Sequence, residues 1–212
     1  MREKERGRAL SPAEQRRKAR FERQKAELEA QGYVMRDLTV GLVYANVMAL
    51  VLALPVCAPF VAVFLWRAPD GAFRMSMAGL VLFLALYAAM ICAHELIHGA
   101  VWAVFAPSHW RAVEFGFIKE YLTPYCTCGE PLEKWQYVVG ALMPTVLLGL
   151  LPAGAAAVTG SAPLLLLGLA LILGGGGDMT IVLALLRHRS AARATVYLDH
   201  PYAAGVVAFE RT

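Results

Sequence analysis

Charged residues are scarce in this chain, and their scarcity excludes an ordinary soluble domain. Only 17% of the 212 residues are Asp, Glu, Lys or Arg, whereas 58% are hydrophobic and the mean hydropathy is +0.53. Soluble domains usually carry about 25% charged residues and about 50% apolar ones. This composition therefore predicts an integral membrane protein.

Cysteine is also infrequent, and its placement excludes a disulfide framework. Cys57 and Cys92 lie in long apolar stretches, and Cys126 and Cys128 form a Cys-x-Cys in a loop. We expect reduced thiols that face the cytoplasm. A Cys-x-Cys is a weak metal signal, so ligation by Cys126 and Cys128 is an alternative to plain thiols.

The chain contains several long apolar stretches. Four stretches could each cross the roughly 30 Å hydrocarbon core of a bilayer, which takes about 20 apolar residues as a helix. They are approximately residues 38–66, 75–106, 135–158 and 163–186. We expect the first to be retained, because a polar segment precedes it and it is too long for a signal peptide. The predicted fold class is an all-α membrane protein with about four transmembrane helices in a domain spanning residues 37–186.

The basic residues predict the orientation of these spans. Residues 1–36, the loop 107–134 and the tail 187–212 together hold 18 of the 20 Lys and Arg side chains. By the positive-inside rule, these segments and both termini face the cytoplasm. Anionic headgroups of the lipid bilayer account for the net charge of +4, so the charge requires no nucleic acid.

The first 36 residues predict one basic cytoplasmic helix. Ser11 is placed as its N-cap, Pro12 at its first turn and Glu14 for a capping box, and Gly32 is a stop signal. The segment is interpreted as a solvated helix steadied by ion pairs, with a partner-binding helix as the alternative.

Residues 112–128 predict a small β-hairpin on the cytoplasmic side, between the second and third spans. Val113, Phe115 and Phe117 alternate with other residues, and the pattern resumes at Tyr125 after a break near Pro124. The hairpin could hold an extended substrate through Phe115, Phe117 and Tyr125, or it could simply cap the helix ends.

The second span contains His94-Glu95-Leu96-Ile97-His98. Ionisable side chains inside a membrane are costly, so their presence indicates a function. His94 and His98 lie one helical turn apart and can direct ring nitrogens to one metal ion. Glu95 points beside that metal, where it can take a proton from a water. The alternative is a pair of core histidines bonded to backbone carbonyls.

Asp178 is the one other charged side chain inside the four spans. Catalytic zinc usually has three protein ligands, so Asp178 is the expected third. Its predicted depth in the fourth span matches that of His94 in the second. Gly174–Gly177 precede it and would allow close helix approach or local unwinding.

With His94, Glu95 and His98 in one span and Asp178 in a later one, the chain resembles membrane zincins of the site-2 protease type. It is most similar to a bacterial membrane family of zincin peptidases whose function is unknown. The likeness covers roughly residues 80–205, including "HELIHG", "ALMPT" and "GGGGDM". Met179 departs from the site-2 pattern, which has glycine there.

The resemblance implies a zinc-dependent metallopeptidase that hydrolyses peptide bonds of membrane or membrane-proximal substrates, located in the bacterial inner or plasma membrane. His94, His98 and Asp178 would be the zinc ligands and Glu95 the general base. Two alternatives are a non-enzymatic membrane protein with a structural zinc and a metal-binding transport or signalling component. A structural site would have a fourth protein ligand and no need of Glu95.

Overall fold

A computed structural model of the protein describes residues 11–67, 76–118, 123–201, 203 and 205–212. In chain order its elements are α2 (Pro12–Ala30), β1 (Val34–Asp37), α3 (Leu42–Arg67), α4 (Met77–Phe105), the 3₁₀ turn η1 (His109–Arg111), β2 (Val113–Ile118), β3 (Thr123–Cys128), α5 (Lys134–Pro144), the π-helical η2 (Thr145–Leu150), α6 (Leu151–Thr159), α7 (Ala162–Gly174), α8 (Gly176–Arg187), β4 (Ala194–Asp199) and β5 (Val206–Arg211).

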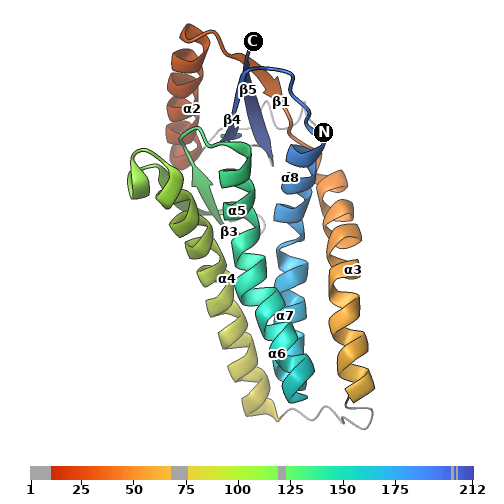
Figure 1. Ribbon diagram of the computed structural model, residues 1–212. Coiled ribbons are helices and arrows are strands. Elements are labelled where there is room, and N and C mark those ends of the chain that lie inside the picture. Colours follow the sequence, from red (N-terminus) through yellow and green to blue (C-terminus); the bar gives the residue numbers. More distant parts are fainter. Residues whose placement is uncertain (1–10, 68–75, 119–122, 202, 204) are drawn as a thin grey trace.

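Long apolar helices form the body of the molecule (Figure 1). Three of them are long and apolar enough to cross a membrane: α3, α4 and the run Lys134–Thr159, in which α5, η2 and α6 follow one another. Helices α7 and α8 together pass the same test but are bent by 43° at Gly175. The described part of the chain thus has three such spans, or four if the bent pair is one.

The bundle is held together by small side chains, as expected where lipid provides no hydrophobic driving force between helices. A cluster of buried residues joins α3, α6 and α7, with Ala53, Ala153 and Ile172 fully buried. Gly168 of α7 lies so close to α6 that a Cβ there would come within 2.6 Å of the Ala153 backbone nitrogen. These contacts fix α7, and through it the bend that leads into α8.

A three-stranded sheet stands at one end of the bundle, and helix α2 packs on it (Figure 1). β5 is the central strand, antiparallel to β1 on one side and to β4 on the other. Phe21 and Leu28 of α2 cover Leu198, Val207 and Phe209 of the sheet. The structure corrects the expectation of an all-α fold with one hairpin, because the predicted tail of residues 187–212 supplies the two strands β4 and β5.

The structure contains a pair of strands between α4 and α5, and an amino-terminal helix α2. β2 pairs antiparallel with β3, with Phe115 opposite Cys126. The capping box of α2 is confirmed: Ser11 Oγ accepts from the Glu14 N–H, and the Glu14 carboxylate accepts from the Ser11 N–H. The hairpin packs against α4 at the same end of the bundle as α2 and the sheet (Figure 1).

Candidate metal centre

His94 and His98 lie on one face of α4, one turn apart. Both side chains are buried, at 8% and 3% exposure, which is unusual for histidines in an apolar helix. Their rings meet edge to face with centroids 4.8 Å apart, and the His98 ring stacks on Trp102 at 5.1 Å. The helical spacing of the motif therefore brings both imidazoles to one point inside the bundle.

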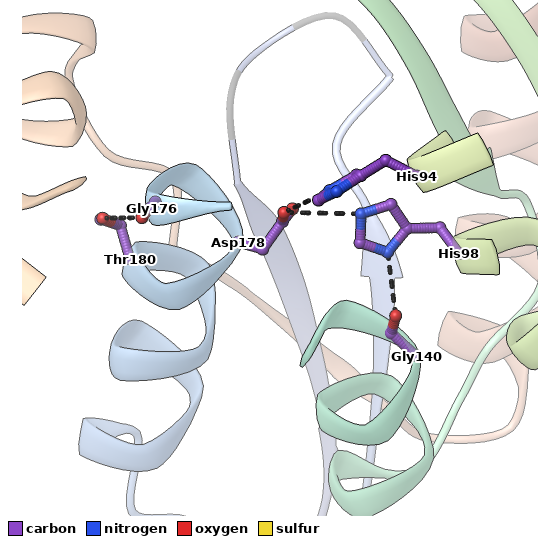
Figure 2. Close-up of polar contacts among 6 residues, drawn as sticks. All are labelled: His94, His98, Gly140, Gly176, Asp178 and Thr180. Atoms are coloured by element: carbon purple, nitrogen blue, oxygen red, sulfur yellow. Dashed lines mark hydrogen bonds and ion pairs between the residues drawn. The ribbon is translucent and has the colours of Figure 1, made fainter. Parts of the chain in front are cut away.

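Asp178 approaches the two histidines from the opposite side (Figure 2). Its Oδ2 lies 3.1 Å from His94 Nε2 and 3.4 Å from His98 Nε2. Ligand atoms of all three residues fall within 4.8 Å of one another, which is a spacing that a single metal ion can bridge. The structure thus brings together side chains from distant parts of the chain: His94 and Asp178 are in contact although they are 84 residues apart in the sequence.

The bend between α7 and α8 places Asp178 in the first turn of α8. Gly175 and Gly176 are buried at this bend: a Cβ on Gly175 would meet Thr145 Oγ1 at 2.1 Å, and one on Gly176 would meet the Ala49 carbonyl oxygen at 2.6 Å. Their neighbours Gly174 and Gly177 face open space. Two of the four glycines therefore permit the close approach that seats the carboxylate.

The hydrogen bonding of His98 fits a metal ligand. His98 Nδ1 lies 2.8 Å from the carbonyl oxygen of Gly140 (Figure 2). A carbonyl oxygen only accepts, so Nδ1 carries a proton and donates, and in the neutral imidazole the lone pair is then on Nε2. That lone pair faces the Asp178 carboxylate, and two acceptors at this distance need a cation or a proton between them. Fixing a ligand imidazole through its other nitrogen is common in metal sites.

The donor set also fits zinc in its chemistry. Two imidazoles and one carboxylate are a usual catalytic zinc set, and three ligands leave a coordination position open. Among the residues that the structure describes, the group contains no fourth His, Cys, Asp or Glu. The arrangement therefore offers the number of protein ligands that is usual at a catalytic zinc rather than at a structural one.

Glu95 lies beside this group rather than in it. It is half-buried, adjacent to His94 on α4, and its carboxylate faces the backbone N–H of Cys126 in β3. It lies outside the cluster formed by His94, His98 and Asp178. The carboxylate therefore faces the hairpin, and it belongs to the residue next to His94 in sequence.

The three residues that the sequence suggested for substrate binding lie on two different faces of the hairpin. Phe115 packs on Gly99, the residue after His98, and Phe117 lies on the same face by strand alternation. Tyr125 is opposite Gly116 and so belongs to the other face, where it packs under Arg17 of α2. Phe115 and Phe117 are 43% and 53% exposed. The α4 face of the hairpin is thus the one beside the metal group.

The two hairpin cysteines stay protonated. Burial raises the pKa of Cys128 to about 12 and that of Cys126 further still. Neither sulfur belongs to the group of candidate ligands around His94. All four cysteines are free. Plain thiols are therefore the better interpretation of Cys126 and Cys128.

Asp199 is a polar residue near the centre that the sequence did not point to. In β4, it accepts hydrogen bonds from the Tyr137 hydroxyl and, at 2.7 Å, from the Cys128 N–H. Burial raises its pKa to about 6, although both hydrogen bonds act the other way. Tyr137 contacts Trp102, which stacks on His98. The alternation in "ATVYLD" was the one signal that this stretch is a strand.

Comparison with known protein families gives a match over half of the chain. A family model described as "Putative zincin peptidase" matches residues 87–193, which is half of the chain. The matched segment contains His94, Glu95 and His98, the hairpin and Asp178. Neither the curated proteins nor the solved structures include a significant match.

Proposed function

This chain belongs to the family described as putative zincin peptidases, and from that membership we propose that it is a zinc-dependent metallopeptidase embedded in a membrane. The observation that carries the proposal is the convergence of His94, His98 and Asp178, with Glu95 beside them and outside the ligand cluster. This is the residue set that metal-assisted peptide hydrolysis uses.

The ligand roles follow from the contacts around each residue. His98 would bind zinc through Nε2, because its Nδ1 donates to the Gly140 carbonyl oxygen. Asp178 Oδ2 lies within reach of both histidines and would be the third ligand. Zinc held there supplies a Lewis acid for the scissile carbonyl and lowers the pKa of a water toward neutrality. The charges of Asp178 and Glu95 together offset the two positive charges of the ion, which reduces the cost of burying each.

Glu95 acts as the general base in this mechanism. Its carboxylate accepts a proton from the water that attacks the peptide carbonyl, and then delivers a proton to the departing amine. The Cys126 N–H of β3 faces this carboxylate. Because Glu95 is only half-buried, its carboxylate is accessible to a water molecule and to a substrate.

The substrate is proposed to be a membrane protein or a peptide at the membrane surface. Helical segments must unwind before cleavage, and an extended peptide can add to the edge of a sheet. The two-stranded sheet of β2 and β3 lies against α4 beside the motif. Phe115 and Phe117 would then contact substrate side chains, whereas Tyr125 lies on the face toward α2.

The competing functions are a structural zinc that fastens α4 to α8 and a metal-binding component of transport or signalling. The set of three candidate ligands favours the peptidase, because a structural zinc is normally held by four protein ligands. A purely structural site would also not require the half-buried carboxylate of Glu95 next to the ligands.

Substitution of the base separates these functions. We expect Glu95→Gln to keep one zinc per chain and a normal Tm, but to lose cleavage by roughly 10²- to 10⁴-fold, the usual contribution of a general base. The assay compares new peptide termini in the membrane proteomes of cells producing wild type, Glu95→Gln or the control Glu29→Gln. Glu29 is an exposed carboxylate on α2, remote from the motif in sequence.

Metal content is measured on the same purified proteins, together with His94→Ala and Asp178→Ala. Loss of zinc in those two variants is expected. Unchanged zinc in both would refute the site itself. Normal cleavage by Glu95→Gln would refute the peptidase mechanism, and loss of its zinc would favour a structural role for the carboxylate.

A further inference from the structure

A basic groove lies between α2 and the connection from α4 to β2. Its volume is about 630 Å³, and Arg16, Arg20 and Arg23 of α2 face Arg111 at the end of η1 across it. The acidic residues that line it are Glu27 and Glu114. The excess of arginine side chains gives the groove a positive charge that neither the metal centre nor the peptidase mechanism uses.

Arg20 links the two sides of the groove, which are α2 and the segment that follows α4. Its guanidinium donates to the carbonyl oxygens of Arg111 and, at 3.1 Å, of Ala112. The stem of the same side chain packs on Gly129, where a Cβ would come within 2.4 Å. Arg16 and Arg23 lie about one turn to either side of Arg20 and so share its face of α2. The groove is therefore a fixed feature of the fold.

The groove opens at the level where the apolar part of α4 ends. Helix α4 stops at Phe105, and η1 follows within a few residues. Trp110 and Trp135 are both more than half exposed there, and Trp135 packs on Phe105. Exposed tryptophans of this kind mark the interface between hydrocarbon and headgroups. The first half of α2 stands beside this level (Figure 1).

We propose that this groove binds the phosphate of an anionic phospholipid from the adjoining leaflet. Arginine is the side chain best suited to phosphate, because its planar guanidinium donates two parallel hydrogen bonds. Arg16, Arg23 and Arg111 are exposed. Arg23 donates through Nε to the Ala19 carbonyl oxygen of its own helix at 3.4 Å, whereas Arg20 is occupied with the carbonyl oxygens of Arg111 and Ala112. A lipid is favoured over an acidic protein segment because headgroups occupy this level around every copy of the protein.

The test measures lipid binding to the full chain in neutral detergent by native mass spectrometry, with phosphatidylglycerol and phosphatidylcholine added in separate titrations. The groove variant is Arg16→Gln, Arg23→Gln and Arg111→Gln together, with Arg20 left in place. The control is Lys18→Gln, Arg189→Gln and Arg193→Gln together, which removes the same charge from residues outside the groove.

Wild type and control are expected to bind phosphatidylglycerol in preference to phosphatidylcholine. The groove variant should lose about 100-fold in affinity for phosphatidylglycerol, since each arginine near an anionic headgroup contributes roughly a fivefold factor. If the triple variant does not fold, Arg111→Gln alone carries the test. It is exposed, and we expect it to lose about fivefold.

Three results would overturn the proposal. Equal losses in the groove and control variants would mean that only overall charge matters. Displacement of phosphatidylglycerol by inorganic phosphate at equal concentration would mean that the groove recognises free phosphate rather than lipid. Displacement by a glutamate-rich peptide at equal concentration would identify an acidic protein segment as its ligand.

Discussion

His98 shows how single residues fix the metal centre. Its Nδ1 donates to the Gly140 carbonyl oxygen, and this contact orients the ring so that Nε2 faces Asp178. Gly140 must be glycine for this contact, because a Cβ there would meet Trp102 Nε1 at 2.0 Å. Trp102 in turn stacks on the His98 ring. The ligand is thus oriented by a hydrogen bond and a stacked ring that both depend on one residue of α5.

Asp199 gives a pH dependence that can be measured. Its pKa is about 6 in the folded protein, above the ordinary 3.8, so folding favours its protonated form. The cost of its charge is absent below about pH 4, grows as the pH rises toward 6, and is constant above that. We expect this charge to lower the free energy of unfolding by about 2 kcal/mol at pH 7. This is less than the full pKa shift implies, because Asp199 is partly accessible to solvent.

Asp199→Asn should remove this cost. The amide can still accept from Cys128 N–H and donate to the Tyr137 oxygen, so both hydrogen bonds have a replacement. We expect the variant to be more stable than wild type at pH 7 and equally stable near pH 4. Tm values in detergent between these pH values provide the test, with Glu29→Gln as control. An unchanged pH profile would show that Asp199 carries no buried charge.

The sequence reveals the metal residues far better than it reveals Asp199. Charged side chains in an apolar span stand out because they are costly there, and His94 and His98 share the period of a helix. Asp199 stands in an ordinary polar stretch near the carboxyl terminus. Its burial depends on Tyr137 and Cys128, which approach from more than 60 residues away. No local pattern contains that information.

At the scale of elements, the bend between α7 and α8 controls where Asp178 sits. Gly176→Ala would push a methyl group into the Ala49 carbonyl oxygen of α3, and backbone cannot move aside as a side chain can. We expect it to lower stability by about 1–3 kcal/mol and to weaken zinc binding. The measurements are Tm and zinc content of the purified chain.

Gly177→Ala is the matched control for that bend. A methyl group there meets nothing within 4 Å, so it should be neutral or stabilise α8 by about 0.5–1 kcal/mol through its better helix propensity. Equal effects at the two positions would mean that close packing on α3 does not seat Asp178.

The elements themselves were predictable where the signal is local. Apolar runs located the spans to within a few residues, and the capping box at Ser11 located the start of α2. The sheet of β1, β4 and β5 was not predicted because Val34 pairs with Glu210, at the opposite end of the chain. The sequence also gave no sign of whether the glycine run would bend a helix or merely pack it.

At the scale of the whole molecule, the pairing of β1 with β5 constrains the topology. β1 precedes α3 and β5 follows α8, so the segments that flank the bundle meet at one end (Figure 1). An even number of crossings must separate them, which agrees with four spans if α7 and α8 form one. The distribution of Lys and Arg predicts that this end faces the cytoplasm, since residues 1–36, 107–134 and 187–212 hold 18 of the 20.

Cysteine labelling of intact cells tests that orientation on the full chain. In a variant whose four native cysteines are replaced by serine, Thr159→Cys lies at the exposed end of α6, and Ser108→Cys is exposed beside η1. A membrane-impermeant maleimide should label Thr159→Cys from outside, but Ser108→Cys only after permeabilisation. The opposite pattern would invert the topology and place the candidate peptidase site toward the outer face. Labelling of both positions from outside would contradict the placement of α6 and η1 at opposite membrane surfaces, because an intact bilayer keeps the reagent from one of them.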